Sequence, residues 1–105
     1  MQKFELFEEH GFKDLTFSNY LVHESEFMKV INFNFKAGQQ LPVHSHDLEG
    51  ELILTILEGN GEFLAADGVS MPANTGDVLV SEIREPHGVK ATTDMRVLVT
   101  IAPPI

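Results

Sequence analysis

The sequence of 105 residues contains no cysteine. This absence excludes disulfides, iron–sulfur clusters, thiolate zinc sites and cysteine nucleophiles, because each of them requires a thiol. A metal site in this chain would therefore have to use nitrogen and oxygen ligands. The five histidines and sixteen acidic residues are the side chains that can supply them.

Basic residues are scarce as well. Seven Lys and Arg residues stand against sixteen Asp and Glu, which gives a formal net charge of −9 at pH 7, and the basic residues form no cluster. Binding to nucleic acids or to anionic membranes requires Lys and Arg gathered on one surface. We therefore expect no nucleic acid and no membrane among the partners.

Long hydrophobic runs are also missing. No segment approaches the roughly 18 apolar residues of a membrane-spanning helix. The beginning of the chain, MQKFELFEEHGF, has acidic residues where a signal peptide has an apolar segment. We expect a cytoplasmic protein, and the length fits a single domain over residues 1–105.

What the sequence does contain is a series of short strands. In residues 27–35, FMKVINFNF, alternation places Ile31, Phe33 and Phe35 on one face. Residues 51–59, ELILTILEG, are apolar on both faces, which is typical of a strand in the middle of a two-layer β fold. A small β domain with such strands has limited core, so we also expect a homodimer that covers the remaining apolar surface.

Turn signals separate the predicted strands. The pair Asp67-Gly68 predicts a tight hairpin turn, and turns recur about every 8–12 residues along the chain, as in sandwiches and barrels. Only residues 5–10 favour a short helical turn. The pattern predicts an all-β fold in which two antiparallel sheets pack against each other.

Two histidines, His44 and His46, stand one residue apart in the segment LPVHSHDLEGE. In a strand, residues i and i+2 point to the same face about 6.5–7 Å apart, so both imidazoles can reach one ion at about 2.0–2.1 Å. In a helix they would point in different directions. His87, in REPHGV, is a third candidate ligand. A carboxylate could complete the site, from Asp47, Glu49 or Glu51.

The spacing of these residues resembles the two motifs of the cupin superfamily. The first motif is a glycine, five residues, His-x-His, three or four residues, Glu, six residues and Gly; Gly38, His44 and His46 match its beginning. The segment GDVLVSEIREPHGV, with Gly76 and His87, is similar to the second. The resemblance implies a small single-domain type-2 cupin, a double-stranded β-helix or jelly-roll-like barrel with core motifs at about 38–61 and 76–91.

For the site, the resemblance implies a divalent transition metal on three histidines and one glutamate: His44, His46, His87 and Glu51. Iron, manganese, nickel, copper and zinc all suit such a donor set, and the sequence does not choose among them. The resemblance also implies a small-molecule substrate or ligand. It leaves open a metal-dependent enzyme, with a dioxygenase favoured over an isomerase or a decarboxylase, and a non-catalytic binding or sensing protein.

The carboxylate position departs from the family pattern. Six residues before Gly59, the family's glutamate position falls on Leu52 rather than Glu51. A bulge near Gly50 could turn Glu51 inward, because a slip of one residue moves a side chain to the other face of a strand. Otherwise the metal would have three histidines and water, or a carboxylate from elsewhere, with Glu49 and Glu82 as the candidates.

Overall fold

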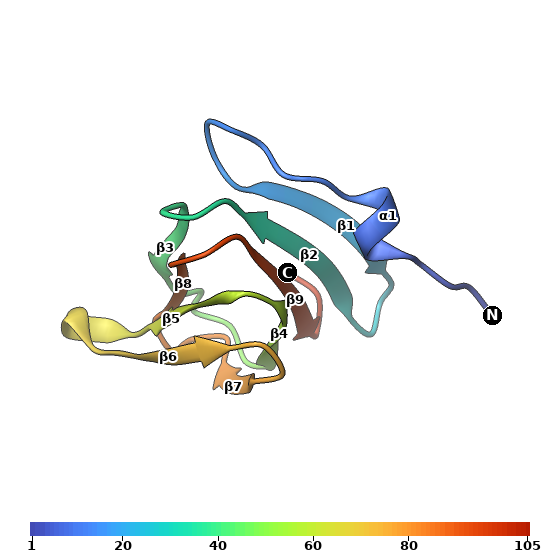
Figure 1. Cartoon of the computed structure of the whole chain (residues 1–105). Coiled ribbons are helices and arrows are strands. Elements are labelled where there is room, and N and C mark those ends of the chain that lie inside the picture. Colours follow the sequence, from blue (N-terminus) through green and yellow to red (C-terminus); the bar gives the residue numbers. More distant parts are fainter.

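The computed structural model describes residues 1–105 and consists of nine strands in two antiparallel sheets that face each other (Figure 1). The strands are β1 (Ser18–Glu24), β2 (Lys29–Phe35), β3 (Gln40–His44), β4 (Glu51–Glu58), β5 (Asn60–Leu64), β6 (Ser70–Asn74), β7 (Val78–Glu82), β8 (His87–Ala91) and β9 (Met95–Ala102). A helical turn, α1 (Leu6–Glu9), and a 3₁₀ turn, η1 (Ala66–Gly68), complete the chain. With four residues in its only α-helix, the protein has no helix that could cross a membrane.

The sheets join strands that are distant in sequence. The larger sheet has the order β1-β2-β9-β4-β7 and the smaller one has the order β3-β8-β5-β6. The last strand, β9, lies between β2 and β4 and pairs antiparallel with both. This arrangement confirms the predicted all-β fold of two packed antiparallel sheets.

Strand β2 alternates as its sequence predicts. Phe35 is fully buried, and Phe33 and Ile31 face the space between the sheets. The intervening Asn32 and Asn34 point to the opposite side, where both are fully buried. Strand β2 therefore has an apolar face toward the space between the sheets and a polar face on the outer side, and the polar face is covered as well.

Strand β4 lies inside the larger sheet, between β9 and β7, as its sequence predicts. Its residues alternate between buried and exposed, with Leu52, Leu54 and Ile56 in the core and Ile53 exposed on the outer face. Ile53 lies opposite Val80 of β7, which is exposed as well. The apolar character of both faces thus does not mean that both are covered within one chain.

The predicted hairpin at Asp67-Gly68 is confirmed. Strands β5 and β6 pair antiparallel on either side of it. Asp67 has a φ of 58° and Gly68 a φ of 74°, the left-handed conformations that a tight hairpin turn requires and that Asp-Gly sequences favour. The hydrophobic core of 13 buried side chains lies between the two sheets; twelve are strand residues, and Ile83 follows β7.

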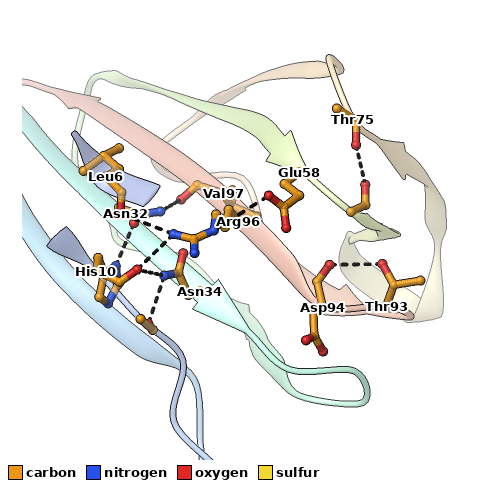
Figure 2. A network of polar contacts seen from close by, with 12 residues as sticks. Leu6, His10, Asn32, Asn34, Glu58, Thr75, Thr93, Asp94, Arg96 and Val97 are labelled. Atoms are coloured by element: carbon orange, nitrogen blue, oxygen red, sulfur yellow. Dashed lines mark hydrogen bonds and ion pairs between the residues drawn. The ribbon is translucent and has the colours of Figure 1, made fainter. Parts of the chain in front are cut away.

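The N-terminal segment covers the outer face of β2 and β9 through a buried polar network (Figure 2). His10 bonds the side-chain oxygen of Asn32 through Nδ1, at 2.7 Å, and the Ser18 hydroxyl through Nε2, at 2.5 Å. The Asn34 amide donates to the His10 carbonyl at 3.0 Å. Because buried polar groups need partners, these bonds fix the segment before β1 on the sheet.

Arg96 of β9 completes this network. Its Nη1 donates to the carbonyl oxygens of His10, at 2.9 Å, and Leu6, at 3.3 Å. The guanidinium lies over the rings of Phe7 and Phe12, with distances of 4.4 Å and 4.9 Å to their centroids. The last strand thereby holds α1 and the chain that follows it, and the polar face of β2 is closed.

Candidate metal centre

A cavity of about 520 Å³ lies between the two sheets. Thirteen residues line it: nine are apolar, most of them from β2, β4 and β9, and the others are three histidines and one lysine. No Asp or Glu is among them. The cavity thus combines apolar walls with a few polar groups, which is the usual character of a small-molecule site.

The three histidines lie on one part of the cavity wall. His44 is the last residue of β3 and His87 the first residue of β8, and the two stand directly opposite each other in the pairing of these strands. His46 lies beyond the end of β3, so the prediction that it shares a strand with His44 is wrong. The side chains of His44 and His46 nevertheless line the same cavity as that of His87.

Hydrogen bonds orient two of the three rings. Nδ1 of His44 lies 2.8 Å from the carbonyl oxygen of Pro42, and Nδ1 of His87 lies 2.6 Å from that of Glu85. Because a carbonyl can only accept, Nδ1 carries the proton in the neutral form of each ring, and Nε2 then has the free lone pair. Metal-binding histidines commonly have this arrangement, in which a backbone carbonyl fixes the tautomer and the direction of the ring.

The spacing of the rings is close to that of shared metal ligands. Two imidazoles that bind one ion through Nε2 at about 2.0–2.1 Å have ring centres about 4.5–5.5 Å apart. The centre of the His44 ring lies 4.6 Å from that of His87 and 5.6 Å from that of His46. In the present conformation no three His, Asp or Glu side chains converge to hold an ion. Convergence requires a side-chain rotation, and the exposed His46 ring, which no hydrogen bond holds, is free to make it.

The protonation state of His87 also suits a ligand. Its side chain is only 5% exposed, and this burial lowers its pKa below the ordinary value for histidine. The bond to the Glu85 carbonyl acts in the opposite direction, and the neighbouring His44 and His46 rings lower the pKa further. His87 is therefore neutral at pH 7, which is the form that coordinates metals.

Glu51 does not reach the histidines. It is exposed at the start of β4, pairs with Glu82 of β7, and faces the side of the sheet away from the cavity. Leu52, the next residue, is 2% exposed and lines the cavity wall. The family's glutamate position is thus occupied by a leucine, and no bulge at Gly50 turns Glu51 inward.

The other candidate carboxylates share the position of Glu51. Glu49, Glu51 and Glu82 border a separate shallow hollow together with Arg84, which lies 3.9 Å from Glu49. Asp47 is exposed and does not line the cavity. The structure therefore brings together His44, His46 and His87 and leaves all of these carboxylates outside.

Sequence reasoning missed Lys29 as a cavity residue. The signal was present, because Lys29 precedes Ile31 and Phe33 by two and four residues and alternation puts all three on one face of β2. Lys29 pairs with Ile101 of β9, which also lines the cavity. It is the only cationic side chain there apart from the titratable histidines.

Comparison with known proteins agrees with the fold. The family model described as the cupin domain matches residues 32–101, so the chain belongs to the cupin family. An RmlC-like cupin protein from Desulfovibrio desulfuricans is 56% identical to it, with 100% of this chain and 99% of that chain covered and a TM-score of 0.97. No curated protein sequence shows significant similarity to the chain.

More distant structures share the architecture alone. A protein from Thermus thermophilus is 21% identical, with 100% of both chains covered and a TM-score of 0.88. Ectoine synthase from P. lautus is 18% identical, with 100% of this chain and 80% of that chain covered and a TM-score of 0.77. At such identities the likeness concerns the fold.

Proposed function

We propose that this cupin binds a divalent transition metal through His44, His46 and His87 and uses it to act on a small oxygenated molecule in the adjoining cavity. The observation that carries the proposal is the free Nε2 of His44 and of His87, each set by a backbone carbonyl bonded to Nδ1. Three neutral imidazoles suit iron, manganese, nickel, copper or zinc. Such an ion, when bound, polarises a substrate oxygen or supports oxygen activation.

The chain's own residues supply orientation and exclusion of water. Leu52, Leu54 and Phe33 cover the wall opposite the histidines, and such apolar walls keep the reacting group away from bulk solvent. We favour a dioxygenase-like oxidation over isomerisation or decarboxylation as the first reaction to test, with oxygen uptake as the assay. The support for an enzyme is the combination of a metal-ligand set with a cavity large enough for a substrate.

Elemental analysis of freshly purified protein tests the metal site. We expect about one equivalent of a transition metal per chain in the wild type and its loss in His44→Ala and His46→Ala. His23→Ala removes an exposed histidine outside the cavity and serves as the matched control. Absence of stoichiometric metal from the wild type, also after incubation with each of the five metals, contradicts the proposal.

A non-catalytic ligand-binding protein is the second candidate, because the cavity is mostly apolar and contains no carboxylate that could act as a general base. Mass spectrometry of the native protein distinguishes the two. A small molecule retained through purification, together with no turnover by the metal-loaded protein, favours binding, whereas metal-dependent consumption of a substrate favours the enzyme.

A further inference from the structure

Lys29 lines the cavity but takes no part in the proposed metal site, so its presence there needs a separate explanation. The chain carries a net charge of −9, yet its main cavity contains no acidic residue and one lysine. In a protein with sixteen acidic residues, this local excess of positive charge distinguishes the cavity from the rest of the molecule. A ligand that enters the cavity therefore meets one lysine and no acidic side chain in the lining, and the Glu24 carboxylate lies beside Lys29 outside the lining.

Only some of the hydrogen-bond donors of the Lys29 ammonium group have partners within the protein. Nζ donates to the main-chain oxygen of Ile105 at 3.1 Å and lies 3.8 Å from the carboxylate of Glu24. The ion pair is loose, and the Glu24 side chain is 49% exposed, so solvent weakens it. An ammonium has three donors, and the Lys29 side chain is 26% exposed. At least one donor therefore has no protein partner.

The position of Lys29 sets the shape of that ligand. Lys29 lies on β2 of the larger sheet, whereas His44 and His87 lie on β3 and β8 of the smaller sheet. Ile31 and Phe33 continue along the same face of β2 and line the cavity. A bound molecule can thus place one polar end against Lys29, an apolar middle against these side chains, and a second polar group near the histidines.

We propose that Lys29 binds the carboxylate of a small organic acid and that such acids are the ligand class of the cavity. This inference names the ligand of the proposed functional site and rests on that assignment. Lys29 acts here as a specificity residue: it selects an anion among molecules of similar size, because the apolar walls alone would favour a neutral ligand.

Direct binding to the metal-free protein tests this inference independently of the metal. Straight-chain acids from butanoate to octanoate and their neutral amides serve as probes in isothermal titration calorimetry. We expect hexanoate to bind the wild type at least about tenfold more tightly than hexanamide, the difference typical of a hydrogen bond between charged groups. This pair of probes requires no variant and therefore no assumption about folding.

Variants of Lys29 test whether this residue causes the preference for the acid over the amide. Lys29→Met should bind hexanoate and hexanamide equally, whereas Lys29→Arg should keep the preference for the acid. Lys90→Met is the control, since Lys90 is an exposed strand lysine outside the cavity and its loss should change nothing. The inference is overturned if none of the acids binds, if Lys29→Met keeps the preference, or if butyl phosphate binds more tightly than every carboxylate.

The outcome separates this inference from the proposed function. Binding of acids that depends on Lys29 in a protein that takes up no metal would retain the ligand class and refute the metal site. Stoichiometric metal on the histidines without any binding of acids would retain the metal site and refute the ligand class.

Discussion

The histidines on the two sides of β2 differ in how many of their ring nitrogens have a protein partner. On the outer face, His10 uses both ring nitrogens, one on Asn32 and one on Ser18. On the cavity side, His44 and His87 each use one nitrogen on a backbone carbonyl and leave the other without a protein partner. The first arrangement suits a structural role, and the second suits a ligand.

The difference shows that burial of a histidine does not by itself indicate a functional site. His10 is 8% exposed and His87 is 5% exposed, so their burial is nearly the same. What separates them is the free lone pair at the end of an oriented ring. The variants below test whether stability depends on the outer network and ligand binding on the cavity, from the largest expected effect to the smallest.

Replacement of Arg96 should have the largest effect on stability. Arg96→Met keeps an apolar stem between Phe7 and Phe12 but removes the donors to the carbonyls of Leu6 and His10. We expect a loss of about 3–4 kcal/mol in the free energy of unfolding, because two buried hydrogen bonds from a charged donor disappear, although each carbonyl keeps one other donor. Urea denaturation measures it.

A second arginine is the control for this change. Arg84 is half exposed and lies 3.9 Å from Glu49, so Arg84→Met should cost less than about 0.5 kcal/mol. Equal losses for the two variants would contradict the structural role of the outer network.

Replacing His10 and His87 in separate variants should distinguish an effect on stability from an effect on metal binding. His10→Ala leaves Asn32 and Ser18 without their partner and should cost about 1–3 kcal/mol while the metal content stays at the wild-type level. His87→Ala should remove the metal and lower the stability of the metal-free protein by only about 1 kcal/mol. Loss of metal in His10→Ala, with the fold intact by circular dichroism, would contradict the comparison.

The sequence carried most of the information for the fold. The alternation in β2 and the Asp67-Gly68 turn are local signals, and each predicted its element correctly. The histidine spacing pointed to one cavity even though His46 lies beyond the strand, since the family motif carries that information. Burial of Arg96 was not predictable in this way, because its partners at Leu6 and His10 are about ninety residues away and the local sequence MRVLVT shows only a strand.

An exposed apolar strip on the far side of the larger sheet is the basis for the proposed homodimer. Ile53, Val78 and Val80 are exposed on β4 and β7, and β7 is an edge strand. We propose that a second copy of the chain covers them. Val80→Lys should shift the sedimentation coefficient from dimer to monomer and change the stability of the monomer by less than about 0.5 kcal/mol. A monomeric wild type at micromolar concentration would refute the dimer.

Glu51 provides the smallest expected effect. Since its side chain lies on the opposite face of β4 from Leu52 and the cavity, Glu51→Gln should change the metal affinity by less than about twofold. A tenfold loss, measured by competition with a chromophoric chelator, would show that Glu51 turns inward when metal binds. Leu52→Glu is the matched variant, because it places a carboxylate at the position that faces the histidines. Tighter metal binding by this variant, together with an unaffected Glu51→Gln, would establish that the metal centre of the wild type consists of three histidines alone.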